Sequence, residues 1–539
     1  MWTAAALGAL KVPLAPAQEA PPDSPAAPAE SRPAKARFRA SPYVPRGSWE
    51  YEILDYWIAS GRIASLSPMV QPYRRIEVAR AIAELEGADL GRGERGWLAR
   101  LRQAYAKELA VLVDGTGARD VELALQLGAG GQLASQTHRD PLRPALEGRF
   151  SETRLMDDLR FSMEGAAGPV AGAFRMRRHG IYRNDPQFPD GRVVPEISNA
   201  IFGELGSRAE EAYLEVQTRY VRIGFGSLYR NWGPPKLDGF IRADYAYSEE
   251  EISYRFGTDR VFLIGMFASY GDYRADTTHY VAMHRLEVRP FDDLLVAVSE
   301  ATVHGGPGQK LDFKLINPVS IWQFARSDGD PLYNKVGQLD AWWRTPLGFN
   351  VYGSFLADAT NERGSCCQMG GSVGLEFPRL LRDWVFRGSV SAVQSLAYVP
   401  NNPDVPWEEY SVERIGLGWD KTDLYLISLQ AEWFPGPGLW LAPKLDVQLK
   451  GAYDFRDGRP PFETLPTWPR ILAGDAETTF RPAVAGRWRA GWTFPLELEW
   501  DVGVNFIQDR GNVVGDDRTE FVGSVTALLR TPRWSFGLD

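Results

Sequence analysis

Apolar and polar residues alternate along much of the chain beyond residue 120. One stretch, 444–455, places five apolar residues on one side, with charged and amide residues between them: Leu445, Val447, Leu449, Tyr453 and Phe455. Comparable stretches are 121–127, 214–225, 425–433, 487–492, 496–506 and 521–529. Since successive side chains of a strand point to opposite faces, each stretch predicts a strand with one apolar and one charged face.

The length and chemistry of these strands favour a membrane barrel. They run for about 10 residues, which spans a bilayer when a strand is tilted, whereas globular strands average about 5 to 6. Charges on the second face suit a water-filled interior. A soluble sandwich or propeller would also alternate, but the strands are long for a sandwich and no blade-length repeat is visible. No run of about 18 apolar residues occurs, which excludes a bundle of transmembrane helices.

The sequence therefore predicts a mainly β fold, a transmembrane antiparallel β-barrel over residues 120–539. At about 20 to 25 residues per strand and connection, this length gives about 16 to 20 strands, and the even number of about 18 is expected. The last strand is expected near Trp534–Asp539. Long connections are expected to fold over or into the extracellular mouth: 180–208, 232–248, 303–333, 399–421 and 456–480.

Before the barrel, apolar residues recur every three or four positions, and this helical period predicts a small periplasmic helical domain over residues 41–115. Ser48 is the expected N-cap of a first helix, and Gly61 is expected to end it. A second helix is expected from Arg75 and a third from Glu94. The apolar stripes recur every three or four residues: Trp49, Ile53, Tyr56 and Trp57; Ile76, Ala79, Ile82 and Ala83; Trp97, Leu101, Tyr105 and Leu109. Three such helices can share one small core.

The first 40 residues predict export rather than structure. Residues 4–10 form a short apolar run, and residues 15–17 read Ala-Pro-Ala, which resembles a cleavage site. Residues 1–17 are interpreted as a truncated signal peptide, because the run lacks a basic segment before it. Residues 18–40 are rich in Pro and Ala and are interpreted as an extended linker.

Charge and composition limit the classes of molecule that the protein is expected to bind. The net charge of −9 argues against a nucleic-acid surface, which is strongly basic. Aromatic residues make up 12% of the chain, as suits outer-membrane lipid at both interfaces. No cofactor and no metal site are predicted; a calcium site at Asp328–Asp330 is weighed, and a plain turn is preferred.

No catalytic set is predicted. A lipase-like barrel needs a His paired with a nucleophile and an orienting acid. His304 lies close in sequence to Ser299 and Glu300, but such residues are common and the pairing is weak. The chain is therefore expected not to be an enzyme.

The helical segment resembles an S-layer homology motif. The matching pieces are WEYEIL at 49–54, GRI at 61–63, QPY at 71–73 and RIEVA at 75–79. The resemblance implies binding of peptidoglycan or another cell-wall polymer through Trp49, Arg75 and Glu77. A single copy is present, whereas such motifs bind in threes. The alternative is that Arg75 and Glu77 only begin a helix, and both readings stay open.

The barrel resembles the Wzi-type capsule assembly family. The residues that carry this resemblance are YRNWGP at 229–234, KLINP at 314–318 and DPLYN at 330–334. The resemblance implies an 18-stranded outer-membrane barrel with a lectin-like role, whose partner is capsular or another surface polysaccharide.

Polysaccharide binding needs flat aromatic faces beside polar groups. Loop residues that fit are Arg230, Asn231, Trp232, Trp322, Arg326 and Asn334. Taken singly, each Trp is more simply a packing residue. The alternative function is a porin or sugar channel with a cell-wall-associated periplasmic head.

Overall fold

The computed structural model describes most of the chain outside the first 38 residues. The described residues are 39–113, 121–135, 140–142, 154–181, 204–244, 248–272, 277–307, 312–317, 333–358, 368–400, 409–412, 415–461, 463–464, 468–491 and 495–538. The predicted signal peptide and all but the end of the predicted linker lie outside them, as do Trp322, Arg326 and Asp328–Asp330.

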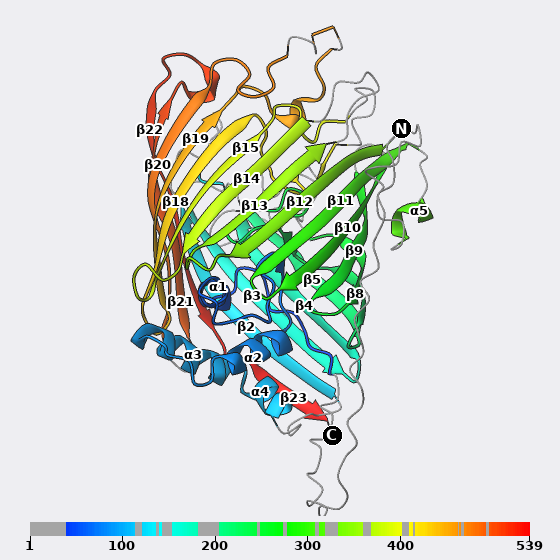
Figure 1. Ribbon diagram of the computed structural model, residues 1–539, viewed down its shortest axis with the longest axis vertical. Coiled ribbons are helices and arrows are strands. Elements are labelled where there is room, and N and C mark those ends of the chain that lie inside the picture. The colour runs from blue at the N-terminus through cyan, green and yellow to red at the C-terminus, as the bar shows by residue number, and fades with distance from the viewer. Residues whose placement is uncertain are drawn as a thin grey trace, which may run out of the picture. The chain divides into compact units, whose positions relative to one another are not determined.

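A closed antiparallel meander dominates the described part of the chain (Figure 1). Its strands are β2 (Val121–Ala134), β3 (Arg154–Ala167), β4 (Val170–Ile181), β5 (Glu204–Gln217), β6 (Val221–Ser227), β8 (Glu250–Gly257), β9 (Val261–Asp272), β10 (Thr277–Phe291), β11 (Leu294–Pro307), β12 (Tyr333–Arg344), β13 (Asn350–Asp358), β14 (Gln368–Phe377), β15 (Trp384–Val393), β18 (Leu424–Gly436), β19 (Leu439–Lys450), β20 (Glu477–Arg489), β21 (Leu496–Gln508), β22 (Arg518–Arg530) and β23 (Trp534–Leu538).

The barrel closes where its two ends in sequence meet. β22 pairs with β2 at residues 128–134, and β23 pairs with the same strand at residues 121–125. Because β22 and β23 lie end to end along β2, the nineteen segments occupy eighteen strand positions among the described residues. The predicted fold class and strand number are confirmed.

The predicted alternation is confirmed along the barrel wall. In β18, Tyr425, Ile427 and Leu429 are exposed on the outside, while Glu432 is buried on the inside. On β6, Phe225 is 64% exposed. Such a belt of exposed aliphatic and aromatic side chains is stable only against lipid, since water disfavours a continuous apolar surface.

The two ends of the barrel differ in their connections. One end carries short turns at 168–169, 218–220, 258–260, 292–293, 345–349, 378–383, 437–438 and 490–495. At the other end, consecutive strands are separated by longer stretches of sequence, including 135–153, 182–203, 308–332, 394–423 and 451–476. The asymmetry is typical of outer-membrane barrels.

The helical head, which is residues 39–113, lies at the short-turn end (Figure 1). It contains α1 (Glu50–Ala59), α2 (Arg75–Glu84), α3 (Arg92–Ala104) and α4 (Ala106–Val113). Arg379, in a short turn, donates to the carbonyl of Ser60 at 2.6 Å, and Arg344 donates to that of Ile58 at 2.9 Å. No described helix is long and apolar enough to cross a membrane.

The head does not have a core of its own. All ten residues of α1 are buried, so the single apolar stripe expected for this helix is not what determines its packing. Trp57, Trp97 and Tyr105 pack in one cluster with wall residues that include Trp342 and Phe434. The core expected from three helices therefore continues into the barrel.

Four local expectations differ from the structure. Residues 214–225 form two strands, because the turn at 218–220 reverses the chain within the apolar run. Tyr453 and Phe455 lie beyond β19 and pack inside the barrel with the loops. The third helix breaks at Tyr105 into α3 and α4, and the N-cap of α1 is Trp49 rather than Ser48.

Candidate functional site: the plugged lumen

The segment after β6 turns into the barrel instead of covering its mouth. Residues 228–244, here called the plug, contain β7 (Asn231–Trp232), which pairs with β1 (Val70–Gln71) of the head. The amide of Gly233 also donates to the carbonyl of Met69 at 3.0 Å. The plug and the head therefore form one hydrogen-bonded unit inside the wall.

Trp232 lies at the centre of the plug and has no exposed surface. Its amide donates to the carbonyl of Arg242 at 2.8 Å, and its own carbonyl accepts from Gln338 of β12 at 3.1 Å. A Cβ at Gly239 would lie 2.1 Å from the Trp232 carbonyl oxygen, so only glycine permits this close approach. Trp232 as found is a packing residue, and a sugar has no access to its ring.

Arg230 anchors the plug to the wall, and Asn231 closes the turn that ends at Gly239. Arg230 forms an ion pair with Glu251 of β8 at 2.6 Å. The Asn231 amide donates to the carbonyl of Leu237 at 3.1 Å, and its oxygen accepts from the amide of Gly239 at 2.9 Å. Both side chains are buried. The structure thus places these predicted sugar-binding residues in the framework of the plug.

Asn334, predicted from another loop, lies at the start of β12 and is also buried. Its amide donates to the carbonyl of Tyr398 at 3.1 Å, which fastens the connection after β15 to the wall. Trp322 and Arg326 lie outside the described residues. In the KLINP motif, Leu315 belongs to α5 (Phe313–Ile316), which packs on the outer face of the wall against Phe267.

Tyr398 and Tyr410, in the described part of the connection after β15, contact the plug from the long-loop side. The hydroxyl groups of Tyr398 and Tyr410 donate to the carbonyls of Phe240 and Ile241, each at 2.8 Å. The two tyrosine rings stack with centroids 5.2 Å apart. Hydrogen bonds from two directions therefore fix the plug, which is the condition for a lasting obstruction.

A cavity of about 500 Å³ remains beside the plug. It is lined by the head, the plug, residues 419–421 and the inner faces of β18 and β19. Trp419 stacks on Phe240 with centroids 5.3 Å apart and an interplanar angle of 19°. Charged pairs line the same space: Lys236 lies 3.1 Å from Asp55, and Arg46 lies 2.7 Å from Asp244.

Of the sugar-binding residues predicted from the sequence, Asn231 lines this cavity, whereas Trp419 and Lys236 do not belong to that set. Trp419 is one of several loop Trp residues, and nothing in the alternation pattern separates it from a membrane anchor. Lys236 lies in the run PPKLDG at 234–239, whose turn residues indicate a loop but not its inward path. The cavity arises from the packing of segments far apart in the sequence.

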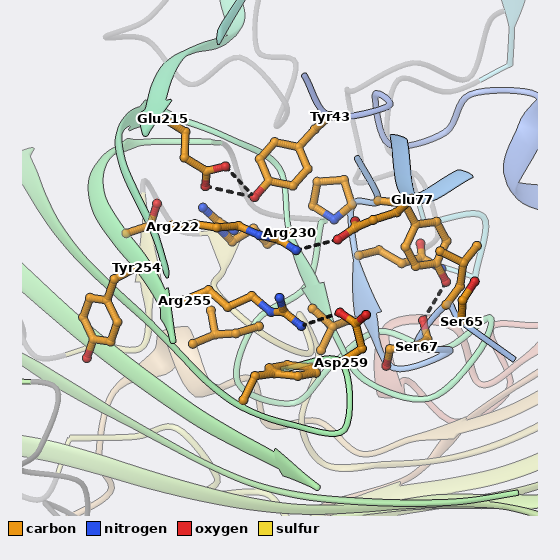
Figure 2. Close-up of a pocket in the computed structure, with 18 of the residues that line it drawn as sticks. Tyr43, Ser65, Ser67, Glu77, Glu215, Arg222, Arg230, Tyr254, Arg255 and Asp259 are labelled. Atoms are coloured by element: carbon orange, nitrogen blue, oxygen red, sulfur yellow. Dashed lines mark hydrogen bonds and ion pairs between the residues drawn. The ribbon is translucent and has the colours of Figure 1, made fainter. Parts of the chain in front are cut away.

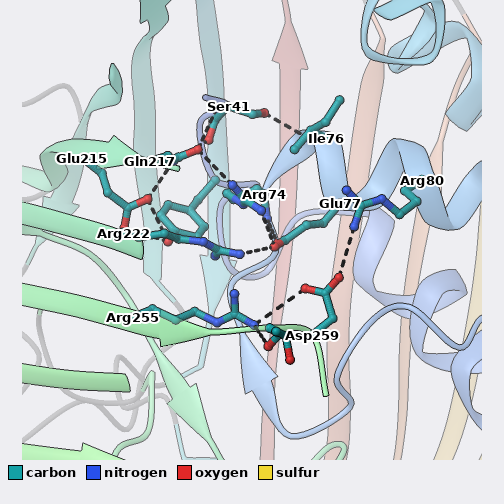
Figure 3. Close-up of polar contacts among 12 residues, drawn as sticks. Ser41, Arg74, Ile76, Glu77, Arg80, Glu215, Gln217, Arg222, Arg255 and Asp259 are labelled. Atoms are coloured by element: carbon teal, nitrogen blue, oxygen red, sulfur yellow. Dashed lines mark hydrogen bonds and ion pairs between the residues drawn. The ribbon is translucent and has the colours of Figure 1, made fainter. Parts of the chain in front are cut away.

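The predicted wall-binding residues join the head to the barrel. Glu77 lies 2.9 Å from Arg74 and 2.5 Å from Arg222 of β6 (Figure 3). Burial opposes its ionisation, but Arg222 and Arg74 hold the pKa of Glu77 well below its usual range. The amide of Ser41 donates to Gln217 of β5 at 2.9 Å, which makes a second link beside the first.

Trp49 and Arg75 face the interior of the head. Trp49 stacks on Trp97, with centroids 5.7 Å apart. Arg75 pairs with Glu108 at 2.5 Å, donates to the carbonyl of Ala104 at 2.9 Å and lies over the ring of Tyr105. All three predicted wall-binding side chains therefore have intramolecular partners, as the helix-start alternative implies for Arg75 and Glu77.

The residues weighed as a catalytic set are not brought together. Ser299 accepts from Arg285 inside the barrel at 3.1 Å, whereas His304 stacks with Tyr280 and lies edge-on to Tyr333 on the outer face. Glu300 contacts His284 at 3.1 Å. An odd separation along a strand places Ser299 and His304 on opposite sides of the wall.

Comparison with known proteins gives one match in sequence and several in structure. Residues 256–390 match the family model of the capsule assembly protein Wzi. Wzi from Escherichia coli, described as an outer-membrane protein involved in group 1 capsule assembly and a carbohydrate-binding β-barrel, superposes with a TM-score of 0.59 at 15% identity. The match covers 92% of this chain and 100% of that one.

Two further solved barrels match with lower TM-scores. OccK8 (OprE) of Pseudomonas aeruginosa gives a TM-score of 0.44 at 8% identity, covering 78% of this chain and 99% of that one. OccAB2 of Acinetobacter baumannii gives 0.43 at 8% identity, covering 77% and 98%. No curated protein matches the sequence. The predicted resemblance to the Wzi-type capsule assembly family and the predicted outer-membrane barrel are confirmed.

Proposed function

We propose that this protein binds capsular or another exported polysaccharide at the cell surface as a lectin-like assembly protein, and that its barrel is not a conduit. The observation that carries the proposal is the plug. A channel needs a continuous aqueous path, whereas here the plug pairs with β1 of the head on one side and is hydrogen-bonded by Tyr398 and Tyr410 on the other. The match to the Wzi family model supports polysaccharide as the ligand class.

The orientation follows from the two kinds of connection. Outer-membrane barrels have short periplasmic turns and longer extracellular loops. The head binds the short-turn end and is therefore assigned to the periplasm. The long connections, including 394–423 and 451–476, then face the outside, where exported polysaccharide would meet them.

We assign the cavity beside the plug as the sugar subsite. Ligand cavities commonly enclose about 300–1,000 Å³, and about 500 Å³ is large enough for a short stretch of sugar. Trp419 supplies an aromatic surface. Lys236, Asp55 and Asp244 supply groups that can donate to or accept from hydroxyls.

The proposed role is binding without catalysis. The His, Ser and Glu residues weighed as a catalytic set lie on different faces of the wall, and most charged groups around the cavity serve as intramolecular ion pairs. A screen for lipid and glycan hydrolysis that finds turnover would contradict this part of the proposal.

The test combines conductance and binding on one preparation. The refolded protein is placed in a planar bilayer with and without surface polysaccharide from the source organism, and a parallel pull-down measures retention of that polysaccharide. We expect no steady conductance, together with retention that falls in Trp419→Ala. The matched control is Trp343→Ala, because Trp343 is 47% exposed on the outer face of β12.

Two results would overturn the proposal. Large steady current steps that sugars block would identify a porin or sugar channel instead. Polysaccharide retention that fails in the unaltered protein would remove the lectin role, whatever the conductance.

A further inference from the structure

A second cavity lies at the joint between the head and the wall, next to the start of the plug (Figure 2). It is bounded by residues 65–73 and α2 of the head and by β6, β8 and β9 of the wall. It encloses about 70 Å³. A water needs roughly 10–15 Å³ of such space, so the cavity admits a few waters or one small group and not a whole sugar.

Positive charge exceeds negative charge among the groups that line this cavity. Five arginines face three carboxylates: Arg80, Arg222, Arg230, Arg255 and Arg289 against Glu77, Glu215 and Asp259. Two of the arginines are already compensated at close range. Arg222 pairs with Glu77 at 2.5 Å, and Arg230 pairs with Glu251 outside the cavity at 2.6 Å.

Of the other three arginines, Arg80 and Arg255 share one weakly held carboxylate. Asp259 lies 3.4 Å from Arg80 and 3.9 Å from Arg255, and its side chain is 64% exposed (Figure 3). Arg289 donates to the carbonyls of Ala64 and Leu66, which fix its position without cancelling its charge. The cavity therefore has a surplus of positive charge, and backbone carbonyls fix the position of Arg289 within it.

Arg255 presents its guanidinium in a fixed orientation. The group lies over the ring of Phe262, 4.1 Å from the centroid, and its hydrogen bond to the Thr258 carbonyl is long at 3.3 Å. A planar guanidinium that is held by stacking keeps its forked donors available for an oxyanion. Partial burial strengthens that interaction relative to open water.

We propose that this cavity, between the head and β8–β9, binds a single oxyanion, a carboxylate or a phosphate, through Arg255, Arg80 and Arg289. The cavity opens beside the short turn at 258–260, so the anion arrives from the periplasm. It is either free phosphate or a carboxylate that a cell-wall peptide presents. Asp259 is the internal competitor that occupies the position weakly when no anion is bound.

Isothermal titration of the full-length protein in a zwitterionic detergent, at low salt in Tris chloride, tests this assignment. One arm uses inorganic phosphate, and the other uses a soluble muropeptide with free carboxylates beside its amidated counterpart. We expect binding in at least one arm, and about tenfold weaker binding in Arg255→Gln, as the loss of a charge-assisted hydrogen bond implies. Binding by phosphate alone, or by the free but not the amidated muropeptide, names the source.

Two further variants complete the test: one is expected to tighten anion binding, and the other to leave it unchanged. Asp259→Asn removes the competing carboxylate and is expected to tighten binding. Arg260→Gln is the matched control, because Arg260 is exposed in the same turn and pairs with Asp292 at 2.7 Å outside the cavity. Heat-modifiability on gels verifies that each variant has a folded barrel.

The assignment is overturned if the unaltered protein binds neither probe, or if Arg255→Gln binds as tightly as the unaltered protein. Failure of Asp259→Asn to tighten binding would also contradict it. None of these outcomes bears on surface-polysaccharide retention, so this assignment and the proposed function can fail separately.

Discussion

Arg487 of β20 donates from one guanidinium nitrogen to both carboxylate oxygens of Glu52 on α1, each at 3.0 Å, across 435 positions of the sequence. The same guanidinium lies 3.0 Å from Glu499 and 3.7 Å from Glu497 of β21. One cation thus holds the head against the wall while it also serves two wall carboxylates. The charged form of Glu52 is therefore less stabilised than it would be if Arg487 paired with Glu52 alone.

The docking of the head is expected to weaken as the pH rises through neutrality, because of Glu52. Burial, opposed by Arg487 and Lys236 and reinforced by Glu499, raises the pKa of Glu52 to about 7. Its carboxyl binds a proton more tightly in the docked head than in a released one, so this contribution is full below the usual pKa and is lost as the pH rises through 7. The upper bound is ~3 kcal/mol. Hydrogen exchange of α1 between pH 5 and 8 measures it, and Glu52→Gln should flatten the profile.

Glu77 is expected to act with the opposite sign on the other side of the head. Its depressed pKa means that ionised Glu77 stabilises docking above its usual titration range, and that this contribution is lost as the pH falls through the lower, docked value. Glu77→Gln leaves Arg222 and Arg74 without their carboxylate and should cost about 3–5 kcal/mol of docking. Protease sensitivity of α2 at neutral pH reports the loss, with exposed Glu86→Gln as the control. Equal sensitivity of the two variants would contradict this role.

Trp232→Ala is expected to loosen the plug and to produce transient conductance. Removing a fully buried indole costs about 3–5 kcal/mol, and its loss weakens the packing of Trp232 with Phe240 and Ile241 inside the plug. Single-channel recording should show brief openings that the unaltered protein lacks. Trp343→Ala on the outer face should not show them, and silence in both variants would mean that other contacts suffice to hold the plug.

The wall could be predicted from the sequence, because an outer-membrane strand has a period that the lipid enforces. Ile427 must face hydrocarbon, so its position in the pattern fixes that of its neighbours. Tyr453 continues the same alternation but lies beyond the wall strand, because its ring is buried equally well in an apolar cluster inside the lumen. A local pattern cannot distinguish these two apolar surroundings.

The site was harder to predict for a related reason. The residues around Arg230 and Trp232 indicate an unusual loop. The sequence does not distinguish a buried Arg that pairs with Glu251 from a surface Arg that binds a ligand. Trp419 lines the cavity and stacks on Phe240, which lies far away in the chain. Long-range packing decides such roles, and it is absent from any single window of sequence.

Arg75→Gln discriminates between the two readings that the helical segment left open. Arg75 of α2 is buried, pairs with Glu108 of α4 and bonds to the carbonyl of Ala104, so we expect its loss to release α4 from α2. Hydrogen exchange should therefore rise across residues 106–113, while sedimentation of the protein with peptidoglycan stays unchanged. Arg102→Gln, at an exposed position in the last turn of α3, is the control. Loss of sedimentation with α4 still protected would instead assign Arg75 to cell-wall binding, as the S-layer-like motif implies, and would require the head to open when it meets the wall polymer.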